Sequence, residues 1–181
     1  MKKFIIYLAM LILVFTLCGC DMDNTPVKKV ENVLTKYQTL DDDVLEDLDN
    51  TLKKDTSLDD KMRNEYRDFM KKHYEDLVYE IKDEMVDGDV ATVTAEITVR
   101  DYSDIVTNAA AYRIDNEEEF TDENGNYNEL LFTKYRLDKL KEAKEKVTYT
   151  IEFNLTKENG EWQVEQLSDE DMSKINGLYA G

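Results

Sequence analysis

Two stretches of the chain alternate apolar and polar residues with a period of two, which is the pattern of half-buried β-strands. Residues 147–155 are apolar at every second position, and a shorter alternating stretch follows the pair Asn159-Gly160. Residues 77–99 alternate in the same way on both sides of Gly88. Each stretch is therefore predicted to fold back on itself as a β-hairpin.

The parity of the apolar positions predicts each turn, because opposed residues in a hairpin share a face. In the second hairpin the apolar positions are odd before the turn and even after it, which predicts a two-residue Asn159-Gly160 turn that opposes Leu155 to Val164. In the first hairpin both sets are odd, so a three-residue loop over 86–88 with a bulge glycine is favoured over a two-residue turn. The predicted apolar face of its first strand comprises Leu77, Tyr79, Ile81 and Met85.

Apolar residues at helical spacing account for most of the remaining chain. A helix is predicted to begin at Thr25-Pro26, because threonine can cap it and proline fits its first position, and to continue through the acidic stretch to Leu52. A second helix is expected after a cap at Ser57 or Asp59. The residues expected on its buried edge are Met62, Tyr66, Phe69, Met70 and His73. The other expected helices are 103–114 with Ser103 as cap, 128–146 after an acidic, exposed loop, and a short one that begins at Ser168 or Asp169 and ends near Gly177.

This order of elements predicts an α+β fold: an antiparallel sheet of two hairpins with helices packed on one face. The opening helices followed by "VDGDVATVTAEITV", and later "KENGEWQVEQL", resemble the NTF2-like, cystatin-related fold. The resemblance covers roughly residues 25–100 and 147–168. The two-helix insertion at 101–146 departs from the short NTF2-like pattern. Residues 25–181 are expected to form one domain.

The N-terminus carries the features of an export signal. Two lysines precede 14 uncharged residues, Phe4 to Leu17, which as a helix would reach roughly 21 Å, short of the roughly 30 Å hydrocarbon core. The chain's two cysteines, Cys18 and Cys20, are separated by one glycine. A disulfide there would close a strained ring, and with one histidine in the chain a four-ligand zinc site cannot be assembled.

The segment "LCGC" resembles the lipobox of bacterial lipoproteins. The resemblance implies a signal peptide over 1–19, cleavage before Cys20, and attachment of diacylglycerol to its sulfur, with fatty acids such as palmitate as the membrane anchor. Two acyl chains hold a protein durably at a bilayer, whereas one holds it weakly. Residues 20–24 would form a lipidated tether. The whole chain is similar to small uncharacterised lipoproteins of Gram-positive bacteria.

The chain is strongly acidic, with 23 basic and 41 acidic residues and a net charge of −18. This charge excludes nucleic acid as a partner, because nucleic-acid binding requires a basic surface. It also disfavours a body that lies flat on anionic lipid. A solvated surface outside the cell is the favoured interpretation.

No constellation in the sequence predicts a catalytic residue. His73 is the only histidine and lies near a predicted helix end, where a positive charge would interact well with the helix dipole. Asp101 and Tyr102, at the end of a predicted strand, match the acid and phenol pair of some NTF2-like isomerases. The alternative is that Asp101 begins the next helix cap and Tyr102 packs in the core.

Two further groups are candidate binding residues. Asp122, Asn124 and Asn126 match the first three alternate ligands of a calcium loop, but a tyrosine replaces the turn glycine and a threonine the bidentate glutamate. This pattern is compatible with two interpretations, a weak Ca²⁺ site or a simple Asx-rich turn. The aromatic residues expected on the inward strand face line a ligand pocket or belong to the core; they are Tyr79, Tyr149, Phe153 and Trp162.

The sequence thus predicts a lipid-anchored, extracytoplasmic binding or interaction lipoprotein, held at the cell membrane through Cys20, with no cofactor other than a weak Ca²⁺. Its partner would be an envelope protein, a peptide or a small ligand. The alternatives are an NTF2-like enzyme of isomerase or hydrolase type and a structural envelope protein.

Overall fold

A computed structural model describes residues 23–181 of the chain. The predicted signal peptide and Cys20 lie outside the described residues. The described elements follow the order α2 (Pro26–Thr39), α3 (Asp42–Lys54), α4 (Asp60–Glu75), β1 (Val78–Asp87), β2 (Val90–Arg100), α5 (Ser103–Asp115), the 3₁₀ helix η2 (Glu117–Phe120), α6 (Glu129–Lys141), β3 (Lys146–Glu158), β4 (Glu161–Val164) and α7 (Asp169–Ile175).

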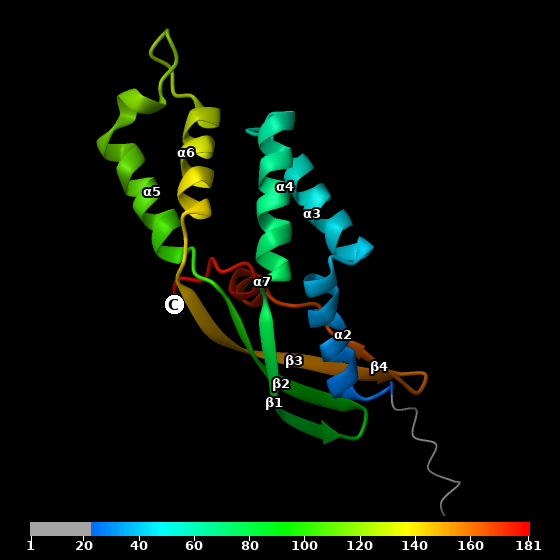
Figure 1. Cartoon of the computed structure of the whole chain (residues 1–181). Helices are drawn as coiled ribbons and strands as arrows, with labels where there is room; N and C mark the ends of the chain where they lie inside the picture. Colours follow the sequence, from blue (N-terminus) through cyan, green and yellow to red (C-terminus); the bar gives the residue numbers. More distant parts are fainter. Residues whose placement is uncertain (1–22) are drawn as a thin grey trace, which may run out of the picture.

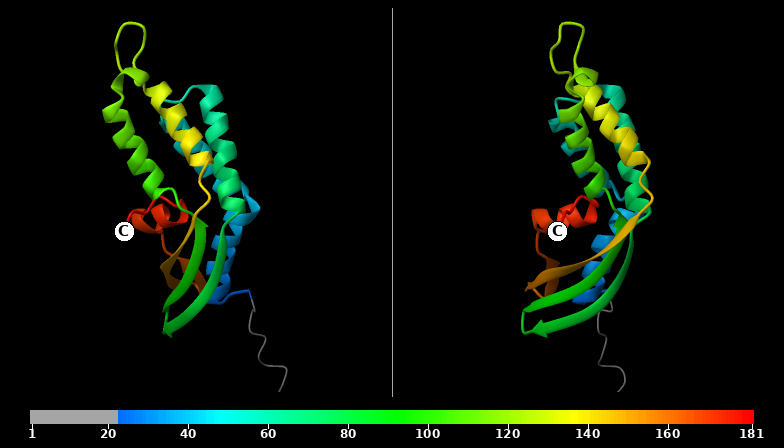
Figure 2. Two further views of the ribbon diagram at one scale, coloured as in Figure 1. Left: turned by 60° about the vertical axis from the view of Figure 1, so that its left-hand side comes forward. Right: turned by 90° about the vertical axis from the view of Figure 1, so that its left-hand side faces the viewer.

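The α+β prediction is confirmed. The four strands form one antiparallel sheet in the order β1-β2-β3-β4, and α2 and α7 pack in its concave side (Figures 1 and 2). Helices α3, α4, α5 and α6 extend away from one end of the sheet, so the molecule is elongated. The arrangement is consistent with an NTF2-like fold.

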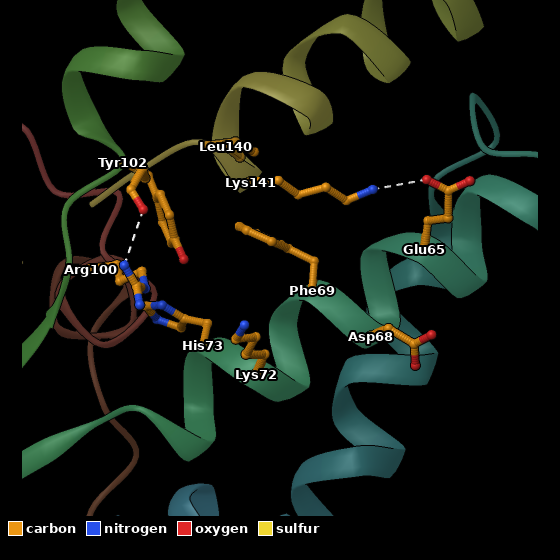
Figure 3. A pocket seen from close by; sticks show the side chains of 10 residues that line it. Glu65, Asp68, Phe69, Lys72, His73, Arg100, Tyr102, Leu140 and Lys141 are labelled. Carbon is orange, nitrogen blue, oxygen red and sulfur yellow. Dashed lines mark hydrogen bonds and ion pairs between the residues drawn. The ribbon is translucent and has the colours of Figure 1, made fainter. Parts of the chain in front are cut away.

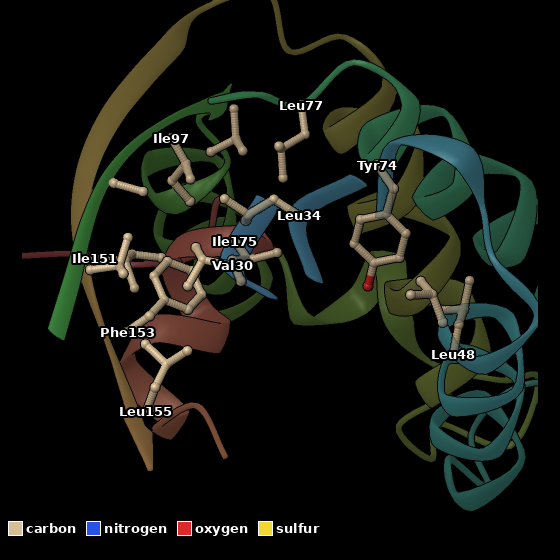
Figure 4. Packing of buried hydrophobic residues seen from close by; sticks show 14 of the residues in the cluster. Val30, Leu34, Leu48, Tyr74, Leu77, Ile97, Ile151, Phe153, Leu155 and Ile175 are labelled. Atoms are coloured by element: carbon tan, nitrogen blue, oxygen red, sulfur yellow. The ribbon is translucent and has the colours of Figure 1, made fainter. Parts of the chain in front are cut away.

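The core lies between the inner sheet face and α2 (Figure 4). Alternate residues of β2 and β3 point inward and face each other in register, for example Val93 opposite Phe153 and Ala95 opposite Ile151. The α2 helix covers them with Val30 and Leu34, neither of which is exposed to solvent. A fully buried side chain of this size contributes about 1.5–3 kcal/mol to folding.

The first predicted helix is divided into two. Thr25 caps α2 as predicted, because its side chain accepts a hydrogen bond from the backbone N–H of Lys28. The helix ends at Leu40, whose φ of 54° lies in the left-handed region, and Asp41 then caps α3. A single helix to Leu52 was therefore the wrong prediction. Separate helices allow Val44, Leu48 and Leu52 to pack against α4.

The second predicted cap is confirmed at Asp59, whose carboxylate accepts the backbone N–H of Met62 at 2.7 Å.

The turn of the first hairpin differs from the prediction. Asp87 pairs with Val90, so the turn has two residues and begins with Gly88 at φ 62°. The required parity is restored inside β1 instead, where Ile81 pairs with Ala95 but Asp83 pairs with Thr94. The extra residue between them forms a β-bulge.

The bulge rotates the apolar face of the distal half of β1. Tyr79 pairs with Ile97 and stays on the inner face, as predicted. Met85 pairs with Thr92 and is 66 % exposed, so its assignment to the inner face was wrong.

The second hairpin agrees with the prediction in every pair. Leu155 opposes Val164, Lys157 opposes Trp162, and the turn is Asn159-Gly160. Both turn residues have positive φ, at 52° and 87°, which is the type I′ pattern that this dipeptide favours.

The predicted insertion at 101–146 is a helical hairpin of α5 and α6 with a small apolar cluster of its own. Phe120 from η2 is buried there beside Phe132 and Ala109. The joining loop was predicted to be exposed throughout, which is wrong for Phe120. An aromatic residue after three glutamates packs inward because the 3₁₀ turn directs it between the two helices.

The C-terminal segment is hydrogen-bonded to the connection between β2 and α5. The short helix α7, capped by Ser168, is followed by Gly177, whose carbonyl accepts a hydrogen bond from the Tyr102 N–H at 2.8 Å. Gly177 has a φ of 68°, and a Cβ atom there would lie 2.0 Å from the carbonyl oxygen of Arg100. Only glycine fits this close approach.

We predict that Gly177→Ala destabilises the protein by about 3 kcal/mol, because left-handed strain of about 1–2 kcal/mol is added to a backbone clash. Gly125→Ala is the matched control: Gly125 has a φ of 78°, but a Cβ there meets no atom within 4 Å. This variant should lose only about 1 kcal/mol. Urea unfolding measures both, and equal losses would contradict the role of the clash.

Candidate binding cleft

A cleft of about 580 Å³ lies where the end of β2 meets α4 and α6 (Figure 3). The α4 helix contributes Phe69, Lys72 and His73, and α6 contributes Leu140 and Lys141. Arg100 and Tyr102 enter from the end of β2 and the connection to α5. The volume falls within the 300–1,000 Å³ range typical of small-molecule sites.

The chain after β2 is held by backbone contacts that place Tyr102 against the cleft. The Asp101 N–H donates to the carbonyl of Glu145, and the Tyr102 N–H donates to Gly177. The Asp101 carboxylate accepts hydrogen bonds from both the backbone N–H and the hydroxyl of Ser103. Ser103 is thus the first residue of α5 and not its cap, which corrects the prediction.

These contacts favour the alternative in which Asp101 begins the cap of the next helix and Tyr102 packs in the core. One oxygen of the Asp101 carboxylate is committed to the start of α5. The Tyr102 ring is 2 % exposed, and burial raises the pKa of its phenol to about 12. The phenol therefore stays protonated at neutral pH and can donate a hydrogen bond but not act as a base. Its hydroxyl end points into the cleft (Figure 3).

His73 is buried in the last turn of α4 and links the cleft to α7. Its Nε2 lies 2.8 Å from the carbonyl oxygen of Ile175. A carbonyl only accepts, so Nε2 carries the proton, and the buried Nδ1 has no partner among the described residues. Burial lowers the pKa of His73, against opposing contributions from the Ile175 hydrogen bond and Asp76.

The ring is therefore neutral at physiological pH. The prediction of a structural role for His73 agrees with this packing, but the expected favourable interaction of a positive charge with the helix dipole is wrong.

The aromatic rings form one continuous wall of the cleft. The Tyr102 ring centroid lies 5.2 Å from that of Phe69 and 5.2 Å from that of His73. Leu140 extends this apolar surface from α6.

Three cations border this wall. Arg100 donates to the carbonyl of Ala143 at 3.1 Å and to the Asp76 carboxylate at 3.2 Å. Lys141 pairs with Glu65 at 2.9 Å, and this hydrogen bond lowers the pKa of the Glu65 carboxyl. Lys72 forms no ion pair within 4 Å in the part of the chain that the structure covers. The cleft thus combines an apolar wall with cationic donors.

The four aromatic residues expected to line a pocket or to belong to the core do not line this cleft. Phe153 and Trp162 are in the main core. The hydroxyl of Tyr79 lies 3.3 Å from that of Thr35, and the hydroxyl of Tyr149 donates to the carbonyl of Tyr179 at 2.9 Å. None of the four lines the cleft between α4 and α6.

The calcium candidates form a tight turn at the tip of the α5–α6 hairpin. The Oδ1 atom of Asp122 accepts the backbone N–H groups of Asn124 and Asn126, at 2.8 and 2.9 Å. These hydrogen bonds lower the pKa of Asp122. Within residues 23–181, no group of three or more His, Cys, Asp or Glu side chains converges on a possible metal position. Calcium binding stays a prediction.

Sequence reasoning identified His73 and Tyr102 individually but missed the cleft. Lys72 and Lys141 lie 69 positions apart, and no local pattern links them. The one available signal was Lys72 beside His73 at the buried edge of the second predicted helix.

Comparison with known proteins gives one related structure. No protein-family model and no curated protein match the sequence. A crystal structure of a protein described as a lipoprotein, ycdA from Bacillus subtilis subsp. subtilis str. 168, resembles the chain with a TM-score of 0.44 and 16 % sequence identity. The match covers 88 % of this chain and 50 % of that one, so the chain spans about half the length of that protein. Bacillus subtilis is a Gram-positive bacterium, and an NTF2-like domain is not confirmed for this chain.

Residues 23–181 include no helix with the length and apolar character needed to span a bilayer.

The buried, neutral state of His73 predicts a pH dependence of stability. Its folded-state pKa lies below the unfolded value of about 6.5, so the unfolded chain takes up the proton first as the pH falls. The stabilising contribution is present above about pH 6.5 and is lost as the pH falls toward the folded-state pKa. His73→Gln keeps an N–H donor for Ile175 but does not titrate.

Urea unfolding at pH 7.5 and pH 5.0 tests this. Carboxylates such as Asp49, whose pKa is lowered by its hydrogen bond with Arg67, contribute to the acid sensitivity of both proteins, so the comparison is between the two falls in stability. The free energy of unfolding should fall more between these pH values in the wild type than in His73→Gln. Equal falls would show that His73 is not neutral in the folded protein.

Proposed function

We propose that the protein is a lipid-anchored binding protein of the extracytoplasmic membrane face, attached through Cys20, with its ligand site in the cleft between α4 and α6. The observation that carries the anchor is the sequence: 14 uncharged residues, Phe4 to Leu17, end at the leucine of "LCGC", and acidic residues follow. The description of the B. subtilis protein as a lipoprotein agrees with this assignment.

The first described residues indicate which end of the domain would face the membrane. The side chain of Asn24 donates to the carbonyl of Gly160 at 2.9 Å and accepts the N–H of Trp162 at 3.1 Å. The folded domain therefore starts at the β3–β4 turn. From Cys20 to Asn24 the chain reaches at most about 14 Å, so this end would sit close to the bilayer.

The cleft lies at the opposite end of the sheet. The β2 strand runs from Val90, beside the turns, to Arg100 at the cleft. Its ten residue steps span roughly 33 Å. The α4 and α6 helices that flank the cleft extend still further from the β3–β4 turn (Figures 1 and 2). A ligand in solution would reach the cleft without crossing the lipid surface.

Binding is favoured over catalysis by the chemistry of the cleft. His73 is committed to Ile175 through its one N–H, and Tyr102 stays protonated. Neither is paired with a nucleophile, and general acid–base catalysis requires a group that titrates near the working pH. The NTF2-like enzyme alternative therefore has no support from Asp101 and Tyr102.

Cys20→Ala should abolish acylation, because the sulfur is the proposed attachment atom. Cys18→Ala is the matched control, since Cys18 would leave with the signal peptide. In a Gram-positive host fed with labelled palmitate, we expect label on the wild type and on Cys18→Ala but not on Cys20→Ala. Mass spectrometry that finds a free thiol at Cys20 of the membrane-bound wild type would refute the anchor.

A further inference from the structure

The lining of the cleft is much less acidic than the molecule as a whole. The whole chain has 41 acidic and 23 basic residues, nearly two acidic residues for each basic one. Around the cleft the basic residues Lys72, Arg100 and Lys141 outnumber the acidic Glu65 and Asp68. Asp76, which pairs with Arg100, brings the count to three of each sign. In a protein whose long-range field repels anions, this balance is a local departure from the acidic surface.

The three cations differ in how free they are to meet a ligand. Lys72 has no ion-pair partner within 4 Å among the described residues. The pair of Lys141 and Glu65 is exposed, at 40 % and 35 % of their side chains, and such surface pairs contribute at most about 1 kcal/mol. An incoming anion can therefore displace Glu65 at little cost.

Arg100 is held in place and not neutralised completely. Asp76 and the carbonyl of Ala143 each take one N–H from the guanidinium. A guanidinium has five N–H donors, so others stay available for a ligand. Fixed donors of this kind orient a bound anion, because the side chain does not have to be ordered on binding.

The wall of the cleft adds a requirement that a simple anion does not meet. Phe69 is the partly exposed side chain of this wall, beside the nearly buried Leu140 and Tyr102, and Tyr102 adds a protonated hydroxyl. Inorganic phosphate would contact the cations but leave this wall in water. A ligand with an anionic head and an aromatic or aliphatic body would use both parts, since burying apolar area contributes about 25 cal/mol per Å².

We propose that the cleft binds a small amphipathic carboxylate, its carboxylate among Lys72, Arg100 and Lys141 and its apolar body against Phe69 and Tyr102. In Figure 3, Tyr102, Arg100, Lys72 and Phe69 lie around one space, and Lys141 extends from its edge towards Glu65. The inference rests on the proposed binding role and is independent of the lipid anchor.

The test is a titration of the full chain in lipid nanodiscs with three probes, by isothermal titration calorimetry, with empty nanodiscs as blank. The probes are 3-phenylpropionate, its neutral amide, and inorganic phosphate. We expect 3-phenylpropionate to bind with one site per chain. The amide should bind at least about 5-fold more weakly through the loss of one charge contact, and phosphate should also bind more weakly.

Variants locate the site. Lys72→Gln should weaken 3-phenylpropionate about 5-fold, and Lys72→Gln combined with Lys141→Gln about 10-fold or more. Lys71→Gln is the matched control: it makes the same charge change one position away on α4, but Lys71 does not line the cleft. We expect the affinity of Lys71→Gln to match that of the wild type.

Each contrary result has a distinct meaning. Equal binding of the carboxylate and the amide would overturn the ligand class but leave a binding role for the cleft. Equal effects of Lys71→Gln and Lys72→Gln would show that only net charge matters, which overturns the site. Absence of binding by all three probes at millimolar concentration would overturn the inference and the binding role of the cleft together, while the acyl-label experiment would still decide the anchor.

Discussion

The in-register pairing of β2 and β3 is the constraint on which the rest of the structure depends. Their alternating apolar residues form one inner face, and Val93, Ala95, Ile97 and Phe153 on it are completely buried. A slip of one residue would expose such a face to water, and this would cost about 1.5–3 kcal/mol of folding free energy for each large side chain. A bulge costs far less, because about one net hydrogen bond of roughly 1 kcal/mol is lost. This difference explains why β1 accepts a bulge and keeps Tyr79 and Ile81 inside.

The same comparison shows how far the sequence predicts the fold. Alternation predicted the shared inner face of Tyr79, Ile81 and the β2 residues but failed for Met85, because a bulge can correct the parity anywhere along the strand. The turn could therefore not be deduced from the alternation. At the second hairpin the local preference of Asn159-Gly160 and the parity agreed, and the prediction succeeded. Leu40 in the left-handed region could not be predicted either, because leucine has no intrinsic preference for that conformation.

The candidate cleft was less predictable than the fold for a related reason. Helical and strand periodicities report which residues are buried, and they placed His73 at the inner edge of α4 correctly. They say nothing about which exposed cations meet in space. The meeting of Lys72, Arg100 and Lys141 depends on the crossing of α4, β2 and α6, which tertiary packing alone decides. The pKa direction of His73 also depends on this packing, since the helix position alone suggested a charged ring.

The same two residues, His73 and Tyr102, line the cleft and hold the C-terminal segment. Ligand binding in the cleft is therefore linked to the docking of that segment. His73 holds the carbonyl of Ile175, and Tyr102 holds the carbonyl of Gly177, so the aromatic wall of the cleft is the same surface on which α7 docks. A ligand that needs this wall intact would bind only with α7 in place. By mass action it must then stabilise the docked segment, by RT ln(1 + [L]/Kd) for a single site. A larger residue in place of Gly177 would disturb the same backbone contacts and so reduce ligand affinity in the cleft, although Gly177 itself does not line it.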